Sequence, residues 1–196
     1  MKVLHIDSSI LGEGSASRAL TREIVARVKS GHPHAEVTYL DLALEELPHL
    51  SQKSLARGDE GEAARNARAL EQFLAADVLV IGAPIYNFSI PSQLKAWIDR
   101  ILVAGKTFRY TAKGPEGLAG GKEVIVAMAR GGVSGAATNG EFGESYLKFL
   151  FGFLGITNVR VVRAEGLAIS PEHREASLTA ARAAIASVTP LQALAA

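Results

Sequence analysis

The chain has 196 residues, of which 48% are hydrophobic and 21% charged. This length suits one domain spanning 1–196 with a single core, and the apolar share is too high for a disordered chain. The 21 Lys and Arg residues nearly balance the 20 Asp and Glu residues, so the basic excess typical of nucleic-acid binders is absent. Cysteine is also absent, which excludes disulfides, thiol catalysis and cysteine-bound metals. Without a long apolar run or a signal-peptide pattern, we expect a cytoplasmic protein with no membrane partner.

Short β-branched runs alternate with helical patterns along the chain. The first strand is predicted over 3–6, and a helix over 19–30 follows it. A second strand over 36–40 alternates in period two, as a half-buried strand does, and a helical face over 63–74 comes next. The continuous apolar run 78–81 is typical of a central parallel strand that is covered on both faces.

The alternation continues through the second half of the chain. Pro91 opens a helix, since its missing N–H costs nothing at the first helical position. A strand is predicted over 123–128, and a helix around 146–154 follows it. The last two elements are a strand over 159–164 and a helix over 171–188.

This regular order predicts an α/β fold, in which helices cover both faces of a parallel sheet. Five strands suit a flavodoxin-like three-layer sandwich with strand order 2-1-3-4-5, and its ligand lies at the carboxyl ends of the strands. The connections over 43–61 and 105–121 are long for a compact domain. Long loops of this kind are more often lids or interface elements than domain linkers.

Hydroxyl groups gather in the loop after the first strand. Ser9, Ser15 and Ser17 stand among glycines directly before a helix, whose first N–H groups suit a phosphate. Neither the dinucleotide glycine fingerprint nor the P-loop is present, so the loop fits a phosphate monoester better than a pyrophosphate. The alternative is that Ser15 or Ser17 only caps the helix.

Two further loops follow strands of the same predicted sheet. Between two prolines, Tyr86, Asn87 and Phe88 offer a flat apolar wall and an amide for a planar heterocycle, or the aromatic rings only pack beneath the next helix. The pair Gly131 and Gly132 lets backbone N–H groups approach an anionic ring edge, or forms an ordinary turn. Because all three loops converge on one edge of the sheet, together they predict an FMN pocket.

With these motifs, the sequence resembles the FMN-dependent NADH:quinone reductases, also called NADH-azoreductases, over essentially the whole chain. The motifs that carry the resemblance are 8–11, 15–17, 83–88, 108–111, 114–118 and 130–132. It implies a flavodoxin-like homodimer with FMN at the subunit interface. The cofactor-binding residues that it implies are Ser9, Ser15, Ala16, Ser17, Pro84, Ile85, Tyr86, Asn87, Phe88, Ala129, Arg130, Gly131 and Gly132. Some relatives have Met in place of Ile85 and Ser in place of Ala129, which bears on substrate preference and on one hydrogen bond.

The resemblance also implies the reaction. NADH or NADPH passes a hydride to the flavin N5 and leaves, and a quinone or an aromatic azo compound then takes two electrons in the same space, in ping-pong order. No acid or nucleophile is required from the chain, so Asn87 and Tyr110 have supporting roles. Phe88, Tyr110 and Phe151 are expected in the substrate pocket, and Tyr110 and Phe151 are expected to reach across from the partner subunit.

Other functions have weaker support. The five histidines form no pair with metal-ligand spacing and there is no nucleophile-elbow motif, so neither a metal site nor a serine hydrolase is expected. An electron-carrier flavodoxin is the main alternative, but such carriers need a charged docking surface and the net charge is only +1. A regulatory protein of the same fold that has lost its cofactor is a further alternative, which failure to bind FMN would favour.

Overall fold

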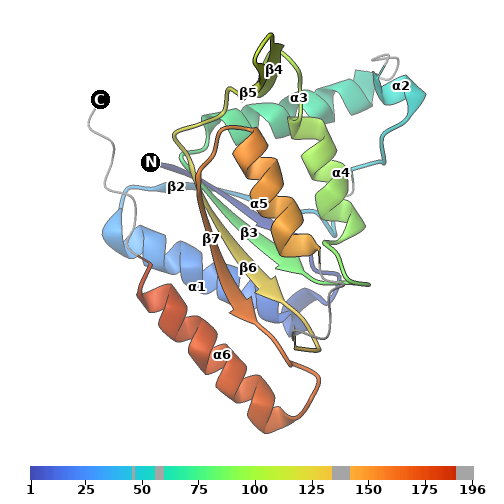
Figure 1. Ribbon diagram of the computed structural model, residues 1–196. Helices are drawn as coiled ribbons and strands as arrows, with labels where there is room; N and C mark the ends of the chain where they lie inside the picture. Colours follow the sequence, from blue (N-terminus) through green and yellow to red (C-terminus); the bar gives the residue numbers. More distant parts are fainter. Residues whose placement is uncertain (46, 56–59, 134–141, 189–196) are drawn as a thin grey trace.

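The computed structural model describes residues 1–45, 47–55, 60–133 and 142–188, and its centre is a sheet of five parallel strands (Figure 1). The strands lie in the order β2-β1-β3-β6-β7. Numbered along the chain within this sheet, the order is 2-1-3-4-5, so the predicted flavodoxin-like arrangement is confirmed. The strands are β1 (Lys2–Asp7), β2 (Glu36–Asp41), β3 (Val78–Pro84), β6 (Glu123–Ala129) and β7 (Asn158–Ala164).

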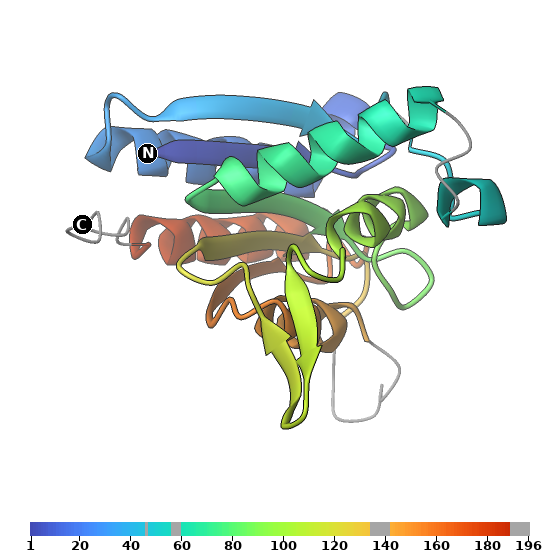
Figure 2. The same cartoon turned by 90° about the horizontal axis from the view of Figure 1, so that it is seen from above.

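Helices cover both faces of this sheet, as the views in Figures 1 and 2 show. One face carries α1 (Ala16–Gly31) and α6 (Pro171–Ala186), and the other carries α3 (Glu60–Ala75), α4 (Ser92–Ile101) and α5 (Gly143–Phe153). Neighbouring residues of a strand point to opposite faces. Val80 of β3 therefore packs in the α1/α6 layer, while Ile81 packs with Trp97 in the opposite layer. Both faces of β3 therefore pack against apolar side chains, which accounts for its continuous hydrophobic run.

The edge strand β2 differs from its prediction. Its alternating pattern predicted one buried face, but the first four residues are all exposed and only Leu40 and Asp41 are buried. Val37 and Tyr39 keep 37% and 50% of their surface exposed. An edge strand has a neighbour on one side only, so its periodicity alone does not ensure that a helix covers it.

The chain over 105–121 is not the loop that the sequence predicted, because it contains a β-hairpin. The strands β4 (Phe108–Thr111) and β5 (Gly114–Gly117) pair antiparallel and project beyond the helix layer (Figure 2). Two contacts dock the hairpin on the end of α5. The ring centroids of Phe108 and Phe153 are 4.9 Å apart, and the backbone of Gly117 lies against Gly155. Two short helices, η1 (Gly12–Gly14) and α2 (Gln52–Leu55), were also not predicted.

We expect Gly117→Ala to destabilise the protein. A Cβ atom at this position would lie 2.1 Å from the Gly155 backbone nitrogen, so the hairpin must move away from α5. Overpacking of this kind typically costs about 1–3 kcal/mol of unfolding free energy, which urea unfolding measures. Gly152→Ala is the matched control, since a Cβ there meets no atom within 4 Å and alanine favours the helix. Equal stability of the two variants would contradict this account of the docking.

Candidate functional site

A cavity of about 200 Å³ lies at the carboxyl edge of the sheet, where four loops meet. It is lined by the loops after β1, β3, β6 and β7 together with the first turns of α1 and α6. The lining residues are Ser9, Leu11, Gly14, Ser15, Ala16, Ser17, Pro84, Ile85, Tyr86, Ala129, Arg130, Gly131, Leu167, Ala168 and Arg174. The structure thus brings together the three loops that the sequence singled out.

The serine loop supplies hydroxyl groups at the start of α1. Ser15 caps this helix, because its Oγ accepts a hydrogen bond from the Arg18 N–H at 3.3 Å. The same Oγ lies 3.0 Å from the Oγ of Ser17, so both hydroxyls remain together at the cavity wall. The first turn of a helix also leaves N–H groups without intrahelical acceptors. Capping and ligand binding are therefore compatible at Ser15.

Tyr86 joins the serine loop to the loop after β3. Its hydroxyl lies 3.1 Å from the Oγ of Ser9 and accepts a hydrogen bond from the Ile10 N–H at 3.3 Å. The Ile85 N–H donates to the Ala129 carbonyl at 2.8 Å, which ties this second loop to the end of β6. Tyr86 therefore does more than pack beneath α4, since its phenol holds two walls of the cavity together.

The loop after β3 then makes a strained two-residue turn. The N–H groups and carbonyls of Tyr86 and Ser89 pair at 2.9 and 3.1 Å, and the two residues between them have positive φ angles. Asn87 has φ 47° and Phe88 has φ 71°. Asparagine tolerates this region, but for a bulky residue it is a genuine outlier. The turn keeps Asn87 exposed and Phe88 70% exposed at the rim, outside the cavity lining.

The glycine loop after β6 is joined to the loop after β7. The carbonyls of Gly131 and Gly132 accept hydrogen bonds from the N–H groups of Ala168 and Gly166, at 3.0 and 2.7 Å. Within the described part of the chain, the N–H groups of Gly131 and Gly132 themselves have no acceptor. Gly131 reaches the cavity, whereas Gly132 lies just beyond its lining.

Two arginines and no carboxylates line the cavity among the described residues. Arg130 pairs with Glu165, with 3.3 Å between its Nε and the Oε1. Arg174 lies in the first turn of α6, where no sequence motif indicated a site residue. Leu167 and Ala168 were also not predicted, although the loop after β7 meets the same edge as the other three loops. The available signal was position alone, since these two residues are apolar and follow no motif.

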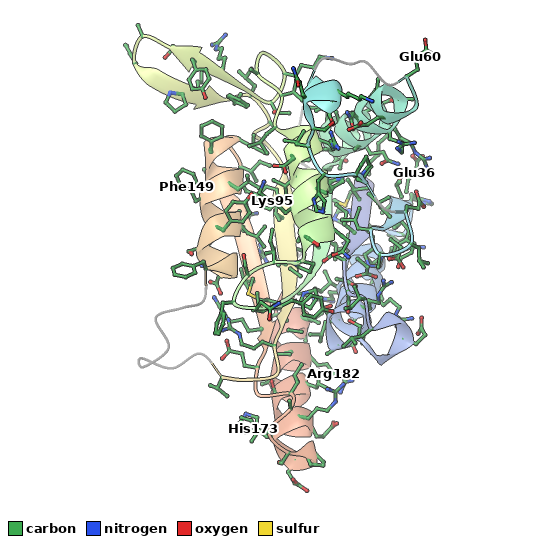
Figure 3. The ribbon with its side chains drawn as sticks, turned by 90° about the vertical axis from the view of Figure 1, so that its right-hand side faces the viewer. Glu36, Glu60, Lys95, Phe149, His173 and Arg182 are labelled. Carbon is green, nitrogen blue, oxygen red and sulfur yellow. The ribbon has the colours of Figure 1, made fainter. Side chains whose placement is uncertain are left out.

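Phe151 corrects the predicted substrate pocket. Its side chain is fully buried in the cluster beneath α3, α4 and α5, so it exposes no surface to a substrate or partner, and that prediction is wrong. The inward face of α5 is set by Leu147, Leu150 and Phe151, while Phe149 is 74% exposed and points away from the body (Figure 3). Tyr110 is 77% exposed on the hairpin and does not line the cavity.

Other kinds of site find little support in the described ranges. No three His, Asp or Glu side chains there lie close enough together to hold a metal ion. None of the helices in those ranges is long and apolar enough to cross a membrane. Among the histidines, His5 is only 6% exposed and packs beside Tyr39, with 4.8 Å between the ring centroids.

Comparisons with known proteins agree with this geometry. Residues 1–188 match a protein family described as having a flavodoxin-like fold. Over 185 residues, 94% of this chain and 95% of the relative, the chain is 57% identical to the FMN-dependent NADH:quinone oxidoreductase of Xanthomonas oryzae pv. oryzae (strain MAFF 311018). It is 50% identical, over 100% of both chains, to the protein of that name from Stenotrophomonas maltophilia (strain K279a).

Two solved structures are similar over nearly their full length. An azoreductase from Bacillus anthracis str. Sterne superposes with a TM-score of 0.85 at 36% identity, covering 95% of this chain and 97% of that one. An FMN-dependent NADH-azoreductase from Bacillus anthracis str. Ames Ancestor, solved in complex with FMN, gives 0.83 at 27% identity, covering 95% and 98%.

The strain at Phe88 is testable with a pair of variants. Phe88→Gly and Phe88→Ala both remove the ring, but only glycine relieves the positive φ of 71°. The left-handed conformation costs a residue with a side chain roughly 1–2 kcal/mol, and glycine avoids this cost. Glycine also loses more conformational freedom on folding, which cancels part of its advantage. We expect the glycine variant to unfold with a free energy higher by about 1 kcal/mol in urea titrations of the flavin-free protein. The same pair at Ser89, which has an ordinary φ, is the control: there Ser89→Ala should have a higher free energy of unfolding than Ser89→Gly.

Proposed function

The chain belongs to the family of FMN-dependent NADH:quinone oxidoreductases and azoreductases with a flavodoxin-like fold, and from that premise we propose that its cavity binds FMN. We propose further that the chain, acting as one domain, reduces quinones and azo compounds with NADH. The observation that supports this most is the donor set at the start of α1. Ser9, Ser15 and Ser17 stand there with first-turn N–H groups, and no described carboxylate lines the cavity. This chemistry fits a phosphate monoester.

The remaining walls fit the rest of FMN. Pockets that enclose a drug-sized ligand usually have about 300–1,000 Å³. A cavity of about 200 Å³ therefore suits the phosphate and the adjoining chain, while the ring extends over the rim. Ser9, Ser15, Ala16 and Ser17 would hold the phosphate. Further along, Pro84 and the stretch from Ile85 to Phe88 would support the ribityl chain and the ring, and the segment from Ala129 to Gly132 would meet the pyrimidine edge.

Bound FMN supplies two-electron chemistry, taking a hydride from NADH or NADPH and delivering two electrons to the acceptor in ping-pong order. The chain's own contribution is to bind, orient and exclude water. The rim holds Phe88, a flat apolar surface against which a planar acceptor can stack. No catalytic acid from the chain is part of this proposal, and solvent or the flavin supplies the protons.

We also propose that two copies of the chain associate through an aromatic surface formed by Phe88, Tyr110, Phe142 and Phe149. Their side chains are 70%, 77%, 60% and 74% exposed, and exposed large aromatic side chains that gather on one part of the surface are typical of an interaction surface. The Phe142 N–H donates to the Phe88 carbonyl at 3.2 Å, so the patch begins at the cavity rim. A second copy would close the open side of the ring and bring its Tyr110 to the acceptor.

Flavin analysis and NADH oxidation test the function directly. We expect about one FMN for each chain in the purified protein, and only FMN after release by heat, because the cavity holds donors for one phosphate. We further expect NADH consumption with quinone and azo acceptors. Retained FMN without NADH oxidation would instead favour an electron carrier, and a colourless protein that fails to bind added FMN would favour a regulatory protein without cofactor.

The shared site predicts the effect of Tyr110→Ala. The contact of an aromatic pair contributes about 0.5–1.5 kcal/mol, so losing the stacking of Tyr110 on the acceptor should raise the KM for the acceptor by up to about tenfold. The free energy of unfolding should change little, because Tyr110 is 77% exposed. Lys113→Ala, an exposed change at the hairpin turn, is the control. Steady-state kinetics and mass in solution measure both effects, and a fully active monomer at high dilution would refute the shared site.

A further inference from the structure

Behind the serine loop lies a second group of polar side chains. His5, Asp7, Arg18, Tyr39 and Asp41 form this group, which we name the β1–β2 polar cluster, at the carboxyl ends of the two strands and on the α1 side of the sheet. Asp7, Arg18 and Asp41 are only 2%, 7% and 7% exposed. None of the five side chains lines the proposed FMN cavity.

Arg18 connects this cluster to the serine loop. Its Nη1 and Nη2 donate to the two carboxylate oxygens of Asp41 at 2.5 and 2.7 Å. Its Nε and Nη2 donate to the carbonyl oxygen of Ser9 at 3.2 and 2.7 Å. One planar guanidinium therefore fastens the backbone of the loop after β1 to the end of β2. A lysine ammonium is a point charge and cannot make these two pairs of hydrogen bonds, one to Asp41 and one to the Ser9 carbonyl.

The neighbours of Arg18 fix its orientation. Its Nη1 also donates to the Tyr39 hydroxyl at 3.1 Å, and that hydroxyl donates to Asp7 at 3.1 Å. Asp7 accepts a second hydrogen bond from Thr21 at 2.8 Å. Burial, with the nearby Asp7, raises the pKa of Tyr39 to about 12, so the phenol stays protonated at neutral pH. The hydrogen bond from Arg18 lowers the pKa of Asp41, which stays ionised.

These contacts use every donor of the guanidinium. A guanidinium has five N–H groups, and those of Arg18 point to Ser9, Asp41 and Tyr39. Arg18 thus has no donor left for a phosphate and can act on one only through the loop that it holds. That loop carries the Ser9 hydroxyl, which accepts the Leu11 N–H at 3.3 Å and contacts the Tyr86 hydroxyl at 3.1 Å.

We infer that Arg18 is a positioning residue for the phosphate of the cofactor, an inference that rests on the proposed binding of FMN. By fixing the Ser9 carbonyl, it holds the serine loop in the shape in which the Ser9, Ser15 and Ser17 hydroxyls face one anion. Its loss should therefore weaken the recognition of the phosphate and leave the recognition of the ring unchanged.

Comparing FMN with riboflavin, which lacks the phosphate, tests this inference in flavin-free protein. We expect Arg18→Met to raise the Kd for FMN about 10- to 100-fold in fluorescence titrations, because weakened hydrogen bonds to the charged phosphate have effects of this size. The Kd for riboflavin should change less than about twofold. Arg18→Lys should recover less than half of the lost FMN affinity on a logarithmic scale. Arg22→Met, one turn further along α1 and paired with the exposed Glu13, should change neither Kd.

A second variant separates positioning from stability. Removing Arg18 leaves Asp41 as an uncompensated buried carboxylate, which destabilises the fold. The double variant R18M/D41N removes that charge and retains an oxygen for the Ala43 N–H, which Asp41 accepts at 3.0 Å. We expect this double variant to regain unfolding free energy but not FMN affinity.

Three outcomes overturn the inference. Recovery of FMN affinity in R18M/D41N would reduce Arg18 to a purely structural role. Equal losses of FMN and riboflavin affinity in Arg18→Met would show a general change of the pocket. If the unaltered chain binds neither flavin, the proposed function itself is overturned, and the inference with it.

Discussion

The parallel register of β1, β3 and β6 is the constraint on which the whole site depends. Asp7 pairs with Gly82, and Pro84 pairs with Ala129, so the three strands end, and their loops begin, at nearly the same edge of the sheet. A side chain at Gly82 would displace Asp7, because a Cβ there would lie 2.6 Å from the Asp7 carboxylate. A shift of one residue in either pairing would turn every side chain to the opposite face and separate the serine loop from Tyr86.

The sequence predicted the parts of the structure that follow from periodicity and strand direction. Apolar runs, together with the period-two alternation of β2, identified all five strands of the sheet, and the rule that ligands lie at carboxyl ends identified three of the four loops around the cavity. The hairpin was missed because β5 reads Gly-Pro-Glu-Gly, which has poor strand propensity. Its pairing with β4 is supported by the Arg109–Glu116 ion pair between the strands and by the docking of Phe108 and Gly117 on α5. Propensity carries no information about such tertiary docking.

Two further features of the site could not be read from local patterns. A helical pattern rich in aromatics does not say which rings face inward, so Phe151 was assigned to the surface that Phe149 occupies. The turn at Asn87 and Phe88 has the backbone of a primed hairpin turn, whose usual sequence is Asn-Gly. A phenylalanine at the second position hides this signal, since the surrounding hydrogen bonds, rather than its own preference, hold the strained conformation.

The helix α5 links the two ends of the aromatic surface. At its start, the Phe142 N–H donates a hydrogen bond to the Phe88 carbonyl in the strained turn. At its end, Phe153 contacts Phe108 of the hairpin, and the backbones of Gly117 and Gly155 lie against each other. The inward side of the same helix is fully buried, which makes it a rigid support. Phe88 at the cavity rim and Tyr110 on the hairpin are therefore held at a fixed separation, although neither belongs to the central sheet. If a second copy covers this surface, both aromatic contacts form in one docking event, and the acceptor pocket takes its shape from α5 as much as from the loops of the sheet.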